Sequence, residues 1–459
     1  MKYTDKGVTD LKIAYIGGGS RGWAWKLMSD LAVSDDISGQ VDLYDIDYEA
    51  ACHNEIIGNK FNTAAGAGTR WSYHARRTIG EALTGADFVI ISILPGTFDE
   101  MASDVHTPEK YGIYQPVGDT TGPGGIIRAL RTIPMIEEIA KAVEKYCPKA
   151  WVINYTNPMA LCVKSLYDTF PDIKAFGCCH EVFNTQNLIA RAISEETGEK
   201  IVDRSSIKTN VVGVNHFTWI TDVKYHNLDA MAIYSDFADK YYESGVEKKD
   251  PDSYFECGHR VKFDLFKRYG VIAAAGDRHL AEFCEGSWYL KDDEQVKEWG
   301  FVRTPVSYRK DNLKERLARS RRLRTGEEMV KIENTGEEGV RQIRALLGLG
   351  DFVTNVNLPN VGQIPNLPLG VVVETNATFR DDRVDPVFAG PVPEGVWQLV
   401  SRAADEQTMV ARAGRERNLE LAFKAFVNDP LVNLDIPTAR GLFDEMVNNT
   451  KHYLEEYFR

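Results

Sequence analysis

The sequence predicts an α/β fold with two parts, a doubly wound parallel sheet in residues 1–200 and an α+β domain in residues 201–459. Short apolar segments alternate with stretches of helical spacing over the first 180 residues or so, a pattern typical of a parallel sheet covered by helices. This alternation fades after about residue 200. The chain has 459 residues, more than a single hydrophobic core usually fills, so we expect two domains packed on each other.

The composition is that of an ordinary globular protein, with 43% hydrophobic and 26% charged residues. The net charge of −13 argues against nucleic-acid binding, so any phosphate group has to be held locally by backbone N–H groups. No apolar stretch is long enough to span a membrane, and the N-terminus lacks the apolar core of a signal peptide. Seven cysteines in so long a chain do not suggest a disulfide framework. We therefore expect a cytoplasmic protein with reduced thiols and no membrane partner.

Five short apolar segments predict the strands of the parallel sheet. They are LKIAYI (11–16), VDLY (41–44), FVIISIL (88–94), WVINY (151–155) and IKAFGCC (173–179). The third is apolar almost throughout, as expected of a strand covered on both faces. Helices are expected between these strands, at about residues 23–33, 50–61, 133–146 and 158–169.

The second half of the chain shows three patterns. Residues 211–225, VVGVNHFTWITDVKY, predict strands and a hairpin. Residues 308–331 are dense in Arg, Lys and Glu and predict an exposed helix, and we interpret the charges of 308–324 as a solvated face only. Helices are expected again from about Asp405.

A dinucleotide-binding motif follows the first predicted strand. Gly17-Gly18-Gly19-Ser20 precedes a helix, and Gly17-x-Gly19-x-x-Gly22 satisfies the G-x-G-x-x-G pattern, in which glycines let the backbone approach a pyrophosphate at the helix N-terminus. Asp45 ends the second strand, where a carboxylate can accept hydrogen bonds from an adenosine ribose, which favours NAD over NADP. Ser92, in the third strand segment, is assigned to the same site. The first domain is therefore predicted to be a Rossmann domain that binds NAD⁺.

Polar segments follow other predicted strands, at the edge where an open parallel sheet places its ligand. The glycines of 118–125 indicate either a loop that approaches a ligand or an ordinary surface turn. Asn157 can hydrogen bond to a sugar hydroxyl, or Asn157-Pro158 can simply open the next helix. Cys179 and His216 form a candidate metal pair if they converge, and their ligand chemistry alone would favour zinc.

A further ionisable cluster lies in the segment GDRHLAEF. It contains Asp277, Arg278, His279 and Glu282 next to the apolar stretch VIAAAG. Burial and neighbouring charges can tune a general acid or base in such a place, although a solvated charge run has the same composition.

These segments together resemble glycoside hydrolase family 4, the NAD- and metal-dependent glycosidases, which do not use the usual pair of carboxylates. The resemblance runs in order through KIAYIGGGS, DLYDID, GDTTGPGGIIRALRTIP, NYTNPM, GCCHE, GVNHFTW, GDRHLAEF and TNVNLPN, and covers most of the chain. The longer strings GCCHEVFNTQ and AAGDRHLAEF most resemble the bacterial α-galacturonidase branch. The resemblance implies a Rossmann domain and a C-terminal domain arranged as in lactate and malate dehydrogenases.

The resemblance also implies a reaction. NAD⁺ takes a hydride from C3 of the sugar, the resulting ketone acidifies the C2 proton, and a base removes it. The leaving group departs from C1, water adds, and the hydride returns, so that NAD⁺ is regenerated in each turnover. A metal bound to the C2 and C3 oxygens stabilises the enolate-like charge.

By resemblance, Cys179 and His216 are metal ligands, for manganese rather than zinc, and Asn157 contacts substrate. Asp119 matches an acidic residue that supports the base. His180 occupies the position of a proton donor that is Asp in the family's 6-phosphoglycosidases. Asp277 matches the base of the unphosphorylated α-glucosidases, where the phosphoglycosidases use Tyr, and His279 is the alternative base or a substrate contact.

The expected substrate is a galacturonide, a small saccharide with a carboxylate. A uronate carboxylate favours a bidentate Arg, for which Arg278 is our first choice, followed by Arg128 and Arg131. The segment LPGTFDEM lacks the phosphate-binding Arg of the phosphoglycosidases, which disfavours a 6-phosphosugar. A neutral α-galactoside or α-glucoside, a malate- or lactate-type dehydrogenase and a non-catalytic NAD sensor are the alternatives. The resemblance further implies a homodimer or homotetramer.

Overall fold

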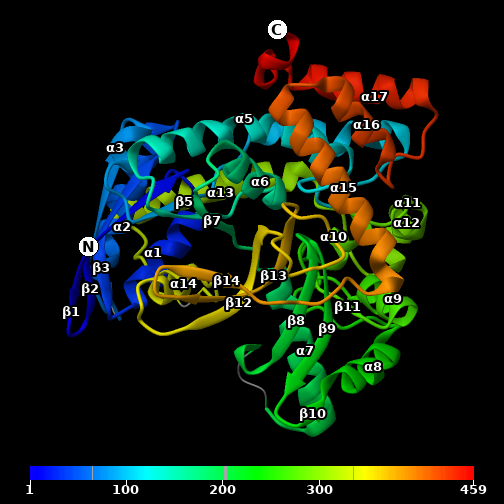
Figure 1. Cartoon of the computed structure of the whole chain (residues 1–459), viewed down its shortest axis with the longest axis horizontal. Helices are drawn as coiled ribbons and strands as arrows, with labels where there is room; N and C mark the ends of the chain where they lie inside the picture. The colour runs from blue at the N-terminus through cyan, green and yellow to red at the C-terminus, as the bar shows by residue number, and fades with distance from the viewer. Residues whose placement is uncertain (65, 201–203, 334) are drawn as a thin grey trace.

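The computed structural model describes residues 1–64, 66–200, 204–333 and 335–459. It contains two β-sheets and many helices (Figure 1). No helix in these ranges is both long and apolar enough to cross a lipid bilayer. The seven cysteines are all free thiols, as expected.

The first sheet has a parallel core of six strands in the order β4-β3-β2-β5-β6-β7, the strand order of the dinucleotide-binding Rossmann fold. The strands are β2 (Gly7–Ile16), β3 (Ile37–Tyr44), β4 (Trp71–Arg76), β5 (Phe88–Ile91), β6 (Trp151–Asn154) and β7 (Lys174–Gly177). β4 was absent from the expected set. Its sequence, WSYHAR, is too polar to stand out as a buried strand.

Helices cover both faces of this sheet because alternate residues of its strands point to opposite sides. On β2, Ile13 packs in one core with α1, α2 and α14, whereas Ala14 packs in another with α3, α5 and α6. These helices are α1 (Trp23–Val33), α2 (Tyr48–Phe61), α3 (Ile79–Leu83), α5 (Gly122–Tyr146), α6 (Met159–Thr169) and α14 (Gly339–Leu346). The predicted doubly wound sheet is therefore confirmed.

The first sheet also receives strands from the distant second half of the chain. β12 (Phe352–Pro359) pairs antiparallel with β7, and β13 (Val372–Arg380) and β14 (Arg383–Pro386) follow it. Outside this strand order, β1 (Lys2–Thr4) pairs antiparallel with β2. The expected domain boundary after residue 200 borders residues outside the described ranges and stays a prediction. The pairing of β12 with β7 nevertheless joins the two halves in one sheet.

The second sheet is antiparallel and confirms the hairpin expected at 211–225. Its strands are β8 (Lys208–Val214), β9 (Phe217–Tyr225), β10 (Leu228–Asp229) and β11 (Ile272–Ala273). It shares a core with α7 (Glu181–Thr197), α8 (Ala230–Tyr241) and α9 (Arg260–Tyr269), drawn in green in Figure 1.

The remaining helices frame the two sheets. A long C-terminal helix packs on α5 and α6, and the last helices lie with it along the top in Figure 1. These elements are α4 (Phe98–His106), α10 (Asp277–Glu282), α11 (Gly286–Tyr289), α12 (Asp293–Glu298), α13 (Val306–Thr325), α15 (Glu394–Glu416), α16 (Leu419–Asn428) and α17 (Ile436–Asn449). The charged helix expected in 308–331 is α13.

Candidate active site

The glycine motif forms a tight turn between β2 and α1. Gly17 has a φ of +91°, and a Cβ added there would lie 2.1 Å from the Ser92 carbonyl oxygen. A Cβ added at Gly18 or Gly19 would lie 2.8 Å or 2.6 Å from a neighbouring side-chain carbon. Side chains are therefore excluded at all three positions, and the backbone stays open to a close ligand, as the motif requires.

Two polar side chains hold this turn. The Asp45 carboxylate, directly after β3, accepts a hydrogen bond of 2.8 Å from the Gly19 N–H. Asn54, on α2, donates to the carbonyl oxygens of Gly18 and Ser20 at 2.7 and 2.9 Å. Asp45 thus lies where the motif places the ribose-binding carboxylate, and that role stays a prediction. Asn54 was not among the predicted site residues because its hydrogen-bond partners lie more than 30 residues away in sequence.

The interpretation of 308–324 as a solvated face holds for most of its charges, because Asp311, Lys314, Glu315, Arg316, Arg319 and Arg321 are exposed. Exposure does not keep Arg316 away from the site, since a Cβ added at Gly22 would lie 2.9 Å from Arg316 Nη1. Arg316 therefore reaches the N-terminal end of α1, beside the glycine turn. Arg309, in the first turn of α13, is half-buried. Arg309 is half-buried because α13 packs against α2 and α4, the helices on either side of the ligand edge of the sheet.

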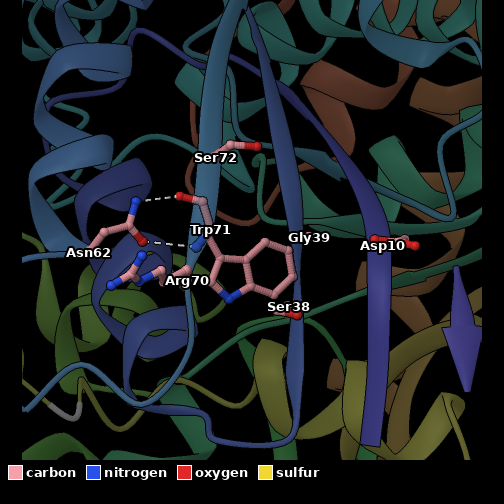
Figure 2. A pocket seen from close by; sticks show the side chains of 7 residues that line it. All are labelled: Asp10, Ser38, Gly39, Asn62, Arg70, Trp71 and Ser72. Carbon is pink, nitrogen blue, oxygen red and sulfur yellow. Dashed lines mark hydrogen bonds between the residues drawn. The ribbon is translucent and has the colours of Figure 1, made fainter. Parts of the chain in front are cut away.

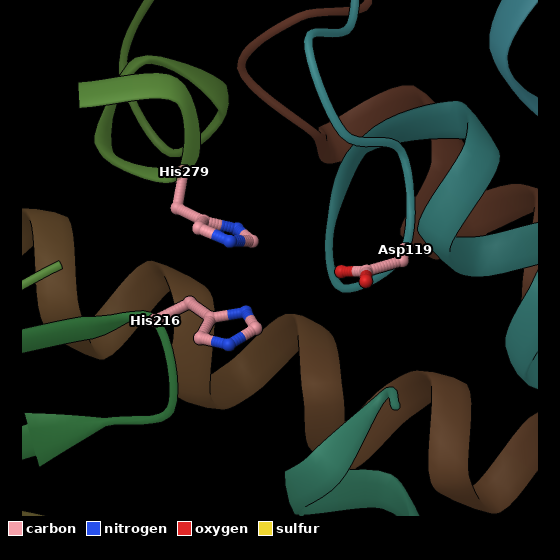
Figure 3. A group of neighbouring side chains, drawn as sticks. All are labelled: Asp119, His216 and His279. Carbon is pink, nitrogen blue, oxygen red and sulfur yellow. The ribbon is translucent and has the colours of Figure 1, made fainter. Parts of the chain in front are cut away.

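Three predicted site residues from distant segments come together next to this edge (Figure 3). The ligand-type atoms of Asp119, His216 and His279 all lie within 4.8 Å of one another. The two imidazole rings are 4.0 Å apart between centroids. We call Asp119, His216 and His279 the central cluster.

His216 occupies the turn of the β8–β9 hairpin. Val214 pairs with Phe217, so Asn215 and His216 form a two-residue loop, and His216 has a φ of +63°. This left-handed conformation is uncommon for a residue with a side chain and is tolerated where the surroundings enforce it. Burial lowers the pKa of His216 to about 3, so the ring is neutral at neutral pH, as a metal ligand requires.

A hydrogen-bond relay orients the His216 ring. Thr120 Oγ1 lies 2.8 Å from His216 Nδ1 and donates to Asp119 Oδ1 at 2.7 Å. Since the hydroxyl proton goes to Asp119, the oxygen accepts from the Nδ1–H of His216. The His216 Nε2 lone pair is then free for a ligand. Burial raises the pKa of Asp119, but the positive charges of His216, His279 and Arg128 lower it by more, so the pKa lies below its ordinary range. Of these three groups, Arg128 is the one that stays charged at neutral pH.

His279 is supported by Glu181, the first residue of α7. His279 Nε2 lies 3.9 Å from Glu181 Oε1, and Glu181 Oε2 accepts a hydrogen bond of 2.8 Å from the Gly276 N–H. Burial alone would raise the Glu181 pKa, but nearby histidines, His279 first, lower it to about 2. Burial lowers the pKa of His279 by more than the Glu181 and Asp119 charges raise it, so the ring is neutral at neutral pH and can accept a proton.

The other candidates lie around the central cluster. Asn157 Nδ2 donates to Asp119 Oδ2 at 3.2 Å, while its buried Oδ1 has no hydrogen-bond partner among the described residues. Asn157 also lies just before Pro158, the N-cap of α6. Both predicted alternatives therefore apply, since Asn157 precedes a helix and faces the site. His180 is half-exposed and lies 3.9 Å from Glu181. Cys179 is buried and lies outside the central cluster. Burial and the charges of Glu374 and Glu181 raise its pKa well above the usual range, and the Asn215 side chain partly opposes this.

Asp277 is not part of the central cluster. Its carboxylate groups instead with Cys257 and His259, and it accepts backbone hydrogen bonds at the N-terminus of α9, from Val261 at 3.3 Å and Lys262 at 3.2 Å. Burial raises the pKa of Asp277 to about 7. This placement favours His279, the alternative base.

The structure separates the three candidate arginines for a substrate carboxylate. Arg131 forms a buried bidentate pair with Asp104, at 3.0 and 2.6 Å, so that candidate is wrong. Arg128 donates to the Asn157 carbonyl oxygen and interacts with Asp119. Arg278 is 8% exposed, and its Nε has no partner in the described part of the chain.

The predicted glycine-rich loop is shorter than expected. Helix α5 begins at Gly122, not near residue 133, with Pro123 in its first turn, where proline is favoured. A Cβ added at Gly125 would lie 2.5 Å from the Thr120 backbone. These glycines therefore serve the packing of the helix start, and the loop that meets the site is confined to residues 118–121.

Comparison with known proteins identifies the family. A model of family 4 glycosyl hydrolases matches residues 12–195, and the model of the C-terminal domain of that family matches residues 211–432. The chain belongs to glycosyl hydrolase family 4. This confirms the resemblance seen in the sequence motifs.

Individual relatives of this family 4 member cover nearly its whole length. It is 60% identical over 459 residues, 99% of both chains, to a Thermoanaerobacterium saccharolyticum protein named alpha-galacturonidase. A crystal structure described as a glucosidase from Bacillus subtilis has a TM-score of 0.92 at 51% identity and covers 96% of this chain and 100% of its own. A 6-phospho-alpha-glucosidase from gut microorganisms, solved with NAD and Mn²⁺, shares the fold, with a TM-score of 0.79 at 18% identity over 97% and 99% of the two chains.

Two supporting residues of the family 4 site were missed because their partners are remote in sequence. Glu374, on β13, accepts from Asn215 at 3.1 Å and from Asn355 at 2.7 Å, and so braces the His216 turn. Glu282 Oε1 accepts from the N–H groups of Val117 and Gly118, at 2.6 and 2.9 Å, just before Asp119. Glu282 lay in the predicted GDRHLAEF cluster, but nothing local indicated this partner.

A separate pocket lies at the opposite edge of the first sheet (Figure 2). It is lined by residues at the amino ends of β3 and β4, where Asn62 forms two hydrogen bonds with the Trp71 backbone, at 2.7 and 2.9 Å. Open parallel sheets bind ligands at their carboxyl ends. This pocket is therefore distinct from the candidate active site.

Proposed function

We propose that this family 4 glycosidase is an α-galacturonidase that releases galacturonic acid from α-linked oligogalacturonides. The observation that carries the proposal is the 60% identity, over 99% of the chain, to a protein named alpha-galacturonidase. The segment 94–101, LPGTFDEM, contains no Arg for a substrate phosphate, which supports a non-phosphorylated sugar. We further propose a cytoplasmic homodimer or homotetramer.

The residues fit NAD⁺ and a divalent metal ion. The turn at Gly17–Gly19 cannot accept side chains, so a dinucleotide can approach its backbone closely and reach the Asp45 carboxylate. His216 and Cys179 are the proposed metal ligands, with Asp119 and the unpartnered Asn157 Oδ1 as neighbouring oxygens. Oxygen donors beside a histidine suit Mn²⁺. When bound, the two groups supply a reversible hydride acceptor and a Lewis acid.

The chain's own groups then handle the protons. His279, ionically supported by Glu181, is the proposed base for the sugar C2 proton, and Asp277 is the alternative. His180, half-exposed at the start of α7, is the proposed donor to the leaving oxygen. Asn157 is the proposed hydrogen-bond partner of a sugar hydroxyl, and Arg278 is the proposed partner of the uronate carboxylate.

The test is a hydrolysis assay with digalacturonate in the presence of NAD⁺, Mn²⁺ and a thiol reductant. We expect hydrolysis without net accumulation of NADH, little cleavage of p-nitrophenyl α-galactoside or α-glucoside, and loss of activity with EDTA. Preferred cleavage of a neutral glycoside would contradict the proposed substrate. Stoichiometric NADH production would instead indicate a dehydrogenase.

A further inference from the structure

Two arginines near the central cluster form no ion pair with a carboxylate among the residues that the structure describes. Arg278 is 8% exposed, yet its guanidinium makes only one hydrogen bond, from Nη2 to the Pro116 carbonyl oxygen at 3.2 Å, and its Nε is unpartnered within the described ranges. Arg309 is half-buried and forms neither a hydrogen bond nor an ion pair with any residue that the structure describes. A desolvated guanidinium without an anion is costly.

Arg131 and Arg303 differ from this arrangement. Arg131 forms two hydrogen bonds with Asp104. Arg303 pairs with Glu109 and Asp293. Among the described residues, the buried Arg128 donates only to a backbone carbonyl oxygen, and it lies near Asp119. The two arginines away from the central cluster are therefore neutralised by carboxylates, whereas those near it are not.

Shared contacts connect the segments that carry Arg278 and Arg309. The Pro116 carbonyl oxygen that accepts from Arg278 also accepts from the Thr304 N–H at 3.3 Å, just before α13. Phe255 lies 5.3 Å from the Arg278 guanidinium and 6.0 Å from the ring of Tyr308, the neighbour of Arg309. The start of α13 is thereby fixed next to Arg278.

The electrostatics agree with this placement. Burial lowers the pKa of Arg309, the Asp119 charge raises it, and the Arg278 charge lowers it again. Burial likewise lowers the pKa of Arg278, and the charges of Glu181, Glu282 and Asp119 raise it. The positive charges of Arg278 and Arg309 therefore repel each other, and Asp119 attracts both. An anion bound between the two guanidinium groups would relieve their repulsion.

We propose that Arg309 and Arg278 together bind the carboxylate of the terminal uronate and make the site selective for acidic over neutral glycosides. This proposal rests on the proposed function and extends it to α13. The sequence had suggested that the charged residues of this helix form a solvated face only. A planar carboxylate accepts paired hydrogen bonds from a guanidinium, which an ammonium cannot reproduce. Arg309 is thus a specificity residue that α13 contributes to the site.

The experiment compares Arg309→Lys and Arg309→Gln with wild type and with Arg321→Lys, an exposed position on the same helix. Each protein, loaded with NAD⁺ and Mn²⁺, is assayed with digalacturonate and with a neutral and a 6-phosphorylated α-galactoside. Galacturonate and NAD⁺ binding are measured by calorimetry. We expect kcat/KM for digalacturonate to fall roughly tenfold to a hundredfold in both Arg309 variants, mainly through KM. Cleavage of the neutral glycoside and the NAD⁺ affinity should be unchanged.

The outcomes separate this proposal from the function on which it rests. Unchanged discrimination in folded Arg309→Lys and Arg309→Gln would overturn the carboxylate site and leave the α-galacturonidase proposal intact. Wild-type preference for the 6-phosphorylated galactoside, lost in the variants, would assign the arginines to phosphate instead. A wild type that binds galacturonate through Arg309 but hydrolyses no galacturonide would contradict the proposed function alone.

Discussion

Thr120 Oγ1 and His216 Nδ1 lie 2.8 Å apart, so the loop before α5 fixes the imidazole at the turn of the β8–β9 hairpin. Supporting hydrogen bonds of this kind orient a metal-ligating histidine and select its tautomer. The relay continues to Asp119, which joins two members of the central cluster through one hydroxyl group.

Replacing Thr120 by Val should therefore weaken the metal site while conserving the side-chain shape. We expect the apparent Mn²⁺ affinity, measured by metal titration of activity, to fall about tenfold to a hundredfold. NAD⁺ binding should be preserved, because the glycine turn is separate. Thr325→Val, at the exposed end of α13, is the control. An unaltered Mn²⁺ titration would show that the relay has no role in metal binding.

Removing the Cys179 thiol should test the second metal ligand. We expect Cys179→Ser and Cys179→Ala to lose nearly all activity and to bind Mn²⁺ more weakly, whereas Cys52→Ala, a half-buried thiol on α2, should behave like wild type. Hydrolysis that survives both EDTA and Cys179→Ala would remove this thiol, and the metal, from the mechanism.

The base can be identified by exchange of the substrate C2 proton with solvent deuterium. Because His279 is in the central cluster and Asp277 is not, we expect His279→Gln to abolish the exchange and Asp277→Asn to retain it when folded. NMR of the recovered sugar gives the deuterium content. Loss of exchange only in Asp277→Asn would assign the base to Asp277 instead.

Arg316 should contribute to cofactor binding, since its guanidinium lies beside Gly22 at the start of α1. We expect Arg316→Ala to raise the NAD⁺ dissociation constant roughly tenfold, with a weaker dependence on salt. Fluorescence titration without substrate measures this directly. The control is Arg319→Ala, whose side chain pairs with Glu328. Equal NAD⁺ affinities in both variants would place Arg316 outside the cofactor site.

Glu282 should make stability depend on pH. Burial raises its pKa to about 8, well above the value of about 4.3 expected in an unfolded chain. The folded state then binds the extra proton, so the stability contribution is complete below about pH 4 and is lost as pH rises through about 8.

The matched variant is Glu282→Gln, because Oε1 accepts the two shorter backbone hydrogen bonds, of 2.6 and 2.9 Å, and an amide oxygen can replace it. Oε2 accepts only a longer one, of 3.3 Å, from the Gly118 N–H. We expect the melting temperature of this variant to decline less than that of wild type between about pH 5 and pH 8. Glu374, with a pKa raised to about 7 by burial, titrates in the same range in both proteins and cancels in the difference. Parallel pH profiles would contradict a protonated Glu282.

Local sequence was sufficient for much of the fold and for the cofactor motif. The turn at Gly17–Gly19 and Asp45 were predictable because their signals, a strand, glycines and a second strand, are close in sequence and have a direct steric meaning. The same holds for the His216 hairpin. β12 was different, because an antiparallel strand that returns from more than 170 residues away leaves no local trace of its partner.

Which groups meet in the site was decided by the tertiary structure. Asp277 and His279 are two positions apart on α10, and residues at this spacing point about 200° apart around a helix axis. One therefore reaches the N-terminus of α9 and the other reaches His216. Likewise, Arg131, a predicted carboxylate binder, pairs with Asp104, whereas Arg309, which looked like a solvated helix charge, has no hydrogen-bond or ion-pair partner among the described residues. Sequence determines which chemical groups are present and their local geometry, whereas long-range packing determines which of them share a low-dielectric site.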